Sequence, residues 1–156
     1  MHMTILLDID GVLVTTPAWR TAELDTDGFL RFNEKAAKNL ARIIDETNAA
    51  IVLTTTHRIN YSVDEWKEIF KVRGIHPFSV SKLNDIKTIG DMADRATEIK
   101  EWVDKQTDRQ PYVIIDDDLS INGLPLTIKG KCVLTKSMLG LDEESTIKAL
   151  DILRSK

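Results

Sequence analysis

The sequence has one cysteine, Cys132, among its 156 residues. One cysteine cannot form an internal disulfide, and no cysteines and histidines are spaced like the ligands of a zinc cluster. No apolar run approaches the ~20 residues that a membrane-spanning helix needs. The apolar residues 5–7 are followed at once by Asp8 and Asp10, which a signal peptide would not contain. We therefore expect a cytoplasmic protein without a membrane partner.

Internal repeats, low-complexity tracts and linkers rich in Pro, Gly or Ser are also lacking. Because domains commonly have ~100–150 residues, we expect one domain over residues 1–156. An excess of basic charge is lacking too, since 21 Lys and Arg face 25 Asp and Glu, a net charge of −4. This balance does not support nucleic acid as a partner, although it leaves room for a local basic groove. The oligomeric state stays open.

Short apolar runs alternate with amphipathic helical patterns, which is typical of an α/β fold with a parallel sheet. The first run is continuous rather than alternating, as in a strand that is buried on both faces, and the run at 78–80 is weak. The predicted strands are residues 4–7, 51–53, 78–80, 112–115 and 132–134, and the predicted helices are residues 34–47, 62–73, 93–106 and 143–154. The segment 15–32 interrupts the alternation, and Asp27-Gly28 within it is a hairpin signal that predicts a small β-flap.

Acidic residues follow two of the predicted strands. Asp8 and Asp10 come at the end of the first strand, with Gly11 allowing a sharp turn, and the aspartates 116–118 follow the fourth strand. Ligands of open α/β sheets bind beyond the carboxyl ends of the strands. Carboxylates gathered there repel one another unless a cation lies between them, and oxygen ligands suit Mg²⁺. The pattern predicts a Mg²⁺ site, the alternative being solvated turns.

Hydroxyl and basic side chains supply the candidate phosphate ligands. Thr54, Thr55 and Thr56 follow the second predicted strand, where hydroxyl and backbone N–H groups can bind phosphate oxygens. Threonines also simply suit a strand, which is the structural alternative. Arg95, near the start of a predicted helix, can neutralise a bound phosphate. Its rivals for that role are Lys82, Lys87 and Lys100.

These motifs, in this order and spacing, resemble those of the haloacid dehalogenase (HAD) superfamily of phosphohydrolases. The matching residues are Asp8, Asp10 and Val12 in the first motif, one of Thr54 to Thr56 in the second, Arg95 in the third, and Asp116 with Asp117 in the fourth. Residues 95–102 and 113–118 further resemble small capless members that are linked to RNA repair. The resemblance implies a three-layer α/β/α Rossmann-like fold with a five-stranded parallel sheet, the flap after the first strand and no large cap.

The resemblance also implies a role for each matching residue. Asp8 would attack the phosphorus and form an aspartyl-phosphate, and Asp10 would act as general acid and then as general base. Mg²⁺ would be held by Asp8, the backbone carbonyl of Asp10 and Asp117, with Asp116 and Asp118 as second choices. The phosphate would be bound by Arg95 and a threonine, with Thr55 favoured over Thr54 and Thr56.

The missing cap bears on the substrate. An open site admits a phosphate on a large molecule and leaves less surface to specify a small metabolite. A polynucleotide end, a nucleotide and a phosphoprotein therefore stay open as substrates of a phosphomonoester hydrolase. The alternative is a binding or regulatory module that keeps the fold and binds Mg²⁺ and phosphate without efficient turnover, because Arg95 stands where the superfamily more often has lysine.

Overall fold

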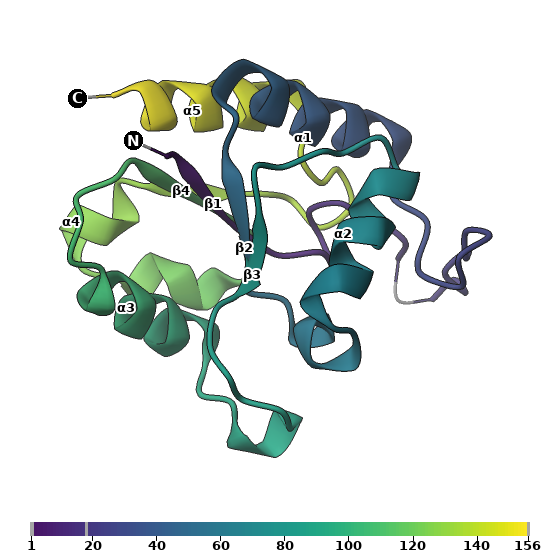
Figure 1. The fold of residues 1–156 in the computed structure, drawn as a ribbon, viewed down its shortest axis with the longest axis horizontal. Coiled ribbons are helices and arrows are strands. Elements are labelled where there is room, and N and C mark those ends of the chain that lie inside the picture. Colours follow the sequence, from purple (N-terminus) through teal and green to yellow (C-terminus); the bar gives the residue numbers. More distant parts are fainter. Residues whose placement is uncertain (1, 18, 156) are drawn as a thin grey trace.

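Five parallel strands form one sheet in the computed structural model, which describes residues 2–17 and 19–155 (Figure 1). The strand order is β3-β2-β1-β4-β5. The strands are β1 (Thr4–Leu7), β2 (Ala50–Leu53), β3 (Val80–Lys82), β4 (Tyr112–Asp116) and β5 (Cys132–Leu134). The predicted α/β fold with a five-stranded parallel sheet is confirmed. The third strand begins two residues later than predicted, because Val80 is the residue that pairs with Ile51 of β2.

Helices cover both faces of this sheet (Figure 1). The helices are α1 (Glu34–Thr47), α2 (Val63–Val72), α3 (Arg95–Lys105), α4 (Leu126–Lys129) and α5 (Glu143–Arg154). Apolar residues of α1, α2 and α5 share a core with Ile5 and Leu7, and residues of α3 and α4 share a second core with Leu6. The alternation of side chains along β1 therefore feeds two cores, which gives the three layers expected from sequence.

Three short 3₁₀ helices and α4 were not predicted, because each is too short to show a helical period. The 3₁₀ helices are η1 (Thr56–Asn60), η2 (Ile89–Asp91) and η3 (Leu119–Gly123). Two of them, η1 and η3, follow strands β2 and β4 directly, so they shape the loops beyond the carboxyl edge of the sheet. Within the described residues, no helix is both long and apolar enough to cross a membrane.

The segment predicted as a β-flap is mostly irregular, and its residue 18 lies outside the described part. It does turn back on itself, through a single antiparallel bridge between Leu24 and Leu30. Gly28 has a φ of 83° in this turn, a conformation that favours glycine. The side chain of Arg73, which follows α2, binds Asp27 in the same turn at 2.6 Å. An ion pair with the body of the protein thus holds the turn more than strand pairing does.

The strand order reverses direction at one point in the sheet. The chain proceeds from β1 to β2 and β3 in one direction, and β4 and β5 lie on the other side of β1. Ligands of such sheets bind beyond the carboxyl ends of the strands where the order reverses, here between β1 and β4. Leu7 pairs with Leu53 on one side and with Ile115 on the other. Asp8, Thr54 and Asp116, the next residues, therefore lie at one level of the sheet.

Candidate active site

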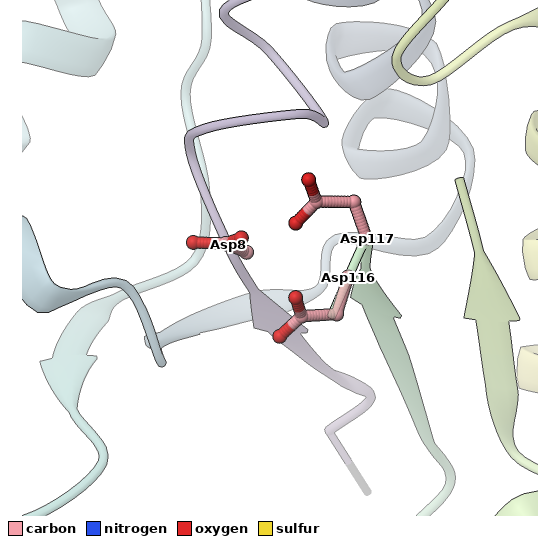
Figure 2. A group of neighbouring side chains, drawn as sticks. All are labelled: Asp8, Asp116 and Asp117. Atoms are coloured by element: carbon pink, nitrogen blue, oxygen red, sulfur yellow. The ribbon is translucent and has the colours of Figure 1, made fainter. Parts of the chain in front are cut away.

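Three carboxylates converge beyond β1 and β4, from Asp8, Asp116 and Asp117 (Figure 2). One oxygen of each lies within 4.8 Å of the others. Asp8 is 4% exposed and Asp116 is fully buried. Burial, and next the charge of Asp116, raises the pKa of Asp8 well above its ordinary value. Burial also raises the pKa of Asp116. Asp8 and Asp116 therefore lie where burial disfavours their ionised forms.

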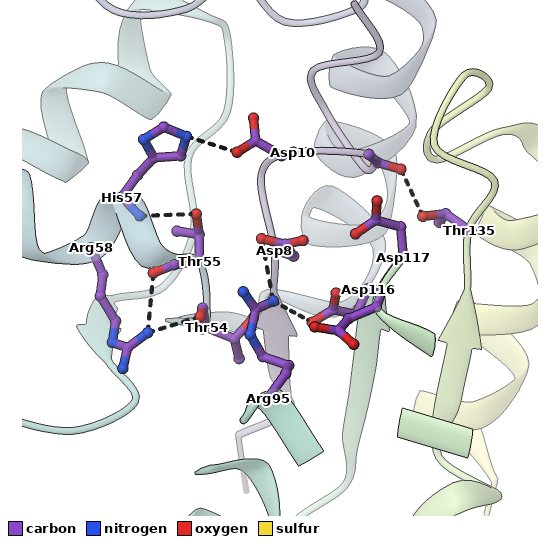
Figure 3. A network of polar contacts seen from close by, with 12 residues as sticks. Asp8, Asp10, Thr54, Thr55, His57, Arg58, Arg95, Asp116, Asp117 and Thr135 are labelled. Atoms are coloured by element: carbon purple, nitrogen blue, oxygen red, sulfur yellow. Dashed lines mark hydrogen bonds and ion pairs between the residues drawn. The ribbon is translucent and has the colours of Figure 1, made fainter. Parts of the chain in front are cut away.

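Arg95 is the cation that the structure brings to these acids (Figure 3). Its Nη1 lies 2.6 Å from Asp116 Oδ2 and 3.4 Å from Asp8 Oδ1. Burial lowers the pKa of Arg95, but the charges of Asp8 and Asp116 outweigh burial and raise it. Asp94, as N-cap of α3, accepts from the backbone N–H of Thr97 and fixes the start of the helix that carries Arg95. Of the rival lysines, Lys100 pairs with Asp104 instead.

The donor set fits a hard divalent cation. One guanidinium against three carboxylates leaves two negative charges uncompensated when all three acids are ionised. All the converging side-chain atoms are carboxylate oxygens, which are the ligands that Mg²⁺ prefers. A Cβ at Gly11 would overlap the Asp117 carboxylate, so only glycine leaves this side chain room to turn toward Asp8. The backbone here is shaped around the acidic cluster.

Two hydroxyl side chains support this loop, and sequence reasoning missed both. Thr135 donates its hydroxyl to the carbonyl of Gly11 at 2.7 Å. Ser137 donates to Asp117 Oδ2 at 2.8 Å. Their only sequence signal is position, since both follow β5 and so reach the same edge of the sheet. The Asp118 side chain does not join the three acids; it caps η3 by accepting from the backbone N–H of Ser120.

Asp10 lies apart from the three converging carboxylates. Its side chain is 58% exposed, and its Oδ2 lies 2.9 Å from Nε2 of His57 on η1 (Figure 3). The predicted metal contact of Asp10 was through its backbone carbonyl, and it stays a prediction. The predicted roles as nucleophile and as general acid and base also stay predictions. The geometry places Asp8 among the acids and Asp10 beside them, with its carboxyl turned toward solvent and His57.

The three candidate threonines occupy different environments. Thr54 is fully buried, and its Oγ1 has no hydrogen-bond partner among the described residues. Thr55 is also buried, and its Oγ1 accepts from the backbone N–H of His57 at 3.2 Å. Thr56 is exposed at the start of η1. Thr54 thus has an unsatisfied hydroxyl level with Asp8, and Thr55 keeps its own donor for a ligand.

A buried ion pair behind this loop was not expected from the sequence. Arg58 is fully buried and donates to the carbonyls of Thr54 at 2.9 Å and Thr55 at 3.2 Å. It also donates to Glu98 Oε2 at 2.7 Å and to Asn84 Oδ1 at 3.1 Å. Glu98 lies on α3, one turn beyond Arg95. Arg58 therefore ties the threonine loop to the helix that carries the cation.

Comparison with known proteins supports this assembly of motifs. A family model described as "HAD domain in Swiss Army Knife RNA repair proteins" matches residues 4–146. Searches of curated proteins and of solved structures returned no match. The matched range contains all four motifs, from β1 through the acids that follow β4. The chain therefore belongs to the family of HAD domains found in Swiss Army Knife RNA repair proteins.

Proposed function

We propose that this HAD domain is a Mg²⁺-dependent phosphomonoester hydrolase that works through an aspartyl-phosphate on Asp8. One observation carries the proposal: Asp8, Asp116 and Asp117 converge within 4.8 Å, with Arg95 paired to two of them. A structural ion-pair network would not need three acids against one cation. A buried carboxylate beside a bound metal and an arginine is suited to phosphoryl transfer, because each group meets charge on the transferring phosphate.

The metal would be held by Asp8, Asp117, Asp116 and the backbone carbonyl of Asp10. When bound, Mg²⁺ would offset negative charge between the nucleophile and the phosphate and orient the phosphate oxygens. The carboxylates supply oxygen ligands only, and Gly11 provides the space in which Asp117 can turn inward. The same acids raise the affinity for a divalent ion by their excess charge, and burial shields that attraction from salt.

In the first step an Asp8 oxygen forms a bond to phosphorus, and the bond between phosphorus and the substrate's ester oxygen breaks. The leaving oxygen takes a proton from the Asp10 carboxyl. In the second step Asp10, now a carboxylate, takes a proton from water as the water oxygen attacks phosphorus. The bond between phosphorus and Asp8 breaks, inorganic phosphate leaves, and both acids return to their starting forms.

The remaining side chains bind the phosphate oxygens. Thr54 and Thr55 offer hydroxyl donors at the end of β2, and Arg95 donates one N–H to Asp116 while its planar guanidinium carries further donors. Their role is to stabilise the charge on the transferring group, which is the larger part of catalysis in phosphoryl transfer. Thr55 stays the favoured hydroxyl, and the unsatisfied Thr54 Oγ1 makes it the alternative.

A polynucleotide end, a nucleotide and a phosphoprotein are the proposed substrate classes. The family description names RNA repair proteins, and this favours the polynucleotide end among the three. No separate cap domain is built between the motifs, since residues 15–32 form one loop with a single bridge in their described part. A phosphate at the end of a long chain can therefore approach the acids from solvent.

A second candidate is a module that binds Mg²⁺ and phosphate without efficient turnover. The Arg95 contacts favour it, because the guanidinium is already engaged by Asp116 and Asp8 and would have to share its donors with a phosphate. Arginine is also a planar donor, and it does not replace the point charge of lysine at a tight site.

The test is hydrolysis of p-nitrophenyl phosphate with Mg²⁺ or with EDTA, for wild type, Asp8→Asn and a matched control. Asp151→Asn makes the same change at an exposed position on α5. The proposal expects turnover that needs Mg²⁺, is retained in Asp151→Asn and is lost in a folded Asp8→Asn protein. Equal turnover in Asp8→Asn would overturn the role of Asp8. Phosphate binding without any turnover would favour the second candidate.

A further inference from the structure

His57 and Asp10 form a contact that the proposed reaction does not yet use. They lie 47 residues apart in sequence, one after β2 and the other after β1, and their side chains share a hydrogen bond 2.9 Å long (Figure 3). The Asp10 side chain is 58% exposed. A carboxyl that is this exposed can rotate freely unless something holds it, so the bond to His57 limits its orientation.

His57 is itself held from two sides. Its backbone N–H donates to Thr55 Oγ1 at 3.2 Å, which fixes the start of η1. Its ring meets the buried ring of Phe29 edge to face, with 5.7 Å between centroids. Phe29 makes the same kind of contact with Tyr61 at 5.4 Å and with Trp66 at 5.3 Å. The imidazole is therefore seated on an aromatic cluster rather than loose in solvent.

The segment inserted after β1, residues 15–32, contains Phe29, against which the imidazole packs. Phe29 lies in the turn that Arg73 clamps, with Nη1 2.6 Å from Asp27 Oδ2 and Nη2 2.9 Å from the carbonyl of Leu30. The Arg73 side chain is only 4% exposed, so its guanidinium is held inside the turn while Asp27 lies at the surface. Arg73 holds the turn, Phe29 in that turn packs against His57, and the inserted segment therefore supports the site although it does not form a cap.

We propose that His57 is a positioning residue that holds the Asp10 carboxyl in place for proton transfer to the leaving oxygen. This inference rests on the proposed function and deepens it. The bond to His57 engages Oδ2, which leaves Oδ1 as the oxygen that gives its proton to the leaving group and later takes one from water. Without the bond, the Asp10 carboxyl spends most of its time in orientations from which no proton reaches the leaving oxygen.

The inference also specifies a substrate class. A nitrophenolate leaves readily without a proton, whereas the alkoxide of an ordinary alcohol does not, so only alkyl esters depend strongly on a well-placed acid. A site that builds a separate support for its acid is suited to phosphomonoesters of unactivated alcohols, such as those of sugar hydroxyls. Asp10 and His57 would contribute little to the first step with an activated aryl ester, whereas the second step, in which Asp10 takes a proton from water, is the same for every ester.

The test compares kcat/KM for p-nitrophenyl phosphate and for glycerol 2-phosphate, in Mg²⁺, because kcat/KM reports the step in which the alcohol leaves. The variants are His57→Ala, His57→Gln, Asp10→Asn and the control His76→Ala, a histidine exposed between α2 and β3. Glutamine can present an amide N–H near the place of the imidazole Nε2 without titrating.

We expect His57→Ala to lose ~10- to 100-fold on glycerol 2-phosphate, part of the 10²- to 10⁴-fold that general acid catalysis supplies, and less than ~3-fold on the aryl ester. Asp10→Asn should show the same pattern more strongly, His57→Gln should recover most of the loss, and His76→Ala should match wild type. If His57 had a purely structural role, its loss would lower kcat/KM equally for both esters, and His57→Gln would not restore it.

The failures are distinguishable. If Asp10→Asn shows the dependence on leaving group and His57→Ala does not, or if His57→Ala is faster than wild type, the role of His57 is overturned while the hydrolase stands. If wild type hydrolyses neither ester, the proposed function fails and this inference with it. Because His57→Gln preserves size and hydrogen bonding, it decides the question even where the alanine variant is poorly folded.

Discussion

Truncation of Glu98 removes the counterion of a fully buried arginine. Arg58 is 0% exposed and Glu98 is 3% exposed, and their side chains meet at 2.7 Å. Burial lowers the pKa of Arg58, and the charge of Glu98 opposes that effect, so this carboxylate offsets the cost of burying a guanidinium that stays charged. We therefore predict that Glu98→Ala destabilises the protein far more than the loss of an exposed glutamate.

The magnitude follows from what remains around Arg58. Removing one partner of a buried pair costs about 3–5 kcal/mol, because the other charge is left uncompensated. In Glu98→Ala the guanidinium keeps three neutral acceptors, namely two carbonyls and Asn84 Oδ1. These acceptors moderate the loss, and the bond from Asn84 to Glu98 at 2.8 Å is lost as well. We expect a decrease of about 3 kcal/mol in the free energy of unfolding.

Urea unfolding followed by tryptophan fluorescence measures this, since Trp66 is buried in the core. Glu101→Ala, an exposed position on the same helix, is the matched control and should cost less than about 0.5 kcal/mol. The double variant Arg58→Met with Glu98→Leu should cost less than the sum of its single variants. A loss below about 1 kcal/mol for Glu98→Ala would show that Arg58 and Glu98 do not form a buried, coupled pair.

Three further outcomes follow from the site. Because burial raises the pKa of Asp8 above its ordinary 3.8, the folded state binds more protons than the unfolded state between pH 3.8 and the raised pKa, and stability is lost as pH rises through that window. In EDTA, Asp8→Asn should therefore raise the free energy of unfolding at pH 8, and the gain should vanish near pH 4; an equal gain at both pH values would contradict this. Gly11→Ala should weaken Mg²⁺ binding about 10-fold or more by calorimetry, while Gly28→Ala, with a similar φ and open space around it, should not. Arg95→Ala should lower kcat/KM about 10²-fold or more and Arg95→Lys far less, whereas equal activity in all three proteins would remove Arg95 from the phosphate site.

The sheet could be predicted because its signal is local. Runs such as residues 112–115 are apolar throughout and too short for helices, and in the structure Val113, Ile114 and Ile115 are fully buried between helices on both faces. The weak run at 78–80 gave a strand shifted by two residues, since Phe78 is 51% exposed and the residues in register with β2 are Val80, Ser81 and Lys82. Pairing with a neighbour decides such an edge strand, and pairing is not written in the local pattern.

The acids of the site could be predicted because the ends of parallel strands share one edge of a sheet. We expected Asp8 and the aspartates 116–118 at this edge, and the structure brings Asp8, Asp116 and Asp117 together there. Arg95 was expected for a different reason, its place near the start of a helix, and the structure pairs it with Asp8 and Asp116. Neither reason could place the supports, since no local spacing links Arg58 to Glu98 or His57 to Asp10. These pairs are separated by 40 and 47 residues, and only the packed chain brings them together.

Covalent catalysis by Asp8 can be tested by trapping the phosphorylated protein during turnover. Wild-type protein would be mixed with a phosphomonoester and Mg²⁺, quenched in acid during turnover, and mapped by peptide mass spectrometry, with Asp8→Asn treated in parallel. We expect one phosphate on Asp8, removable by hydroxylamine as an acyl phosphate is, and none in Asp8→Asn. Phosphate on another residue, or continued phosphate release by Asp8→Asn, would contradict it.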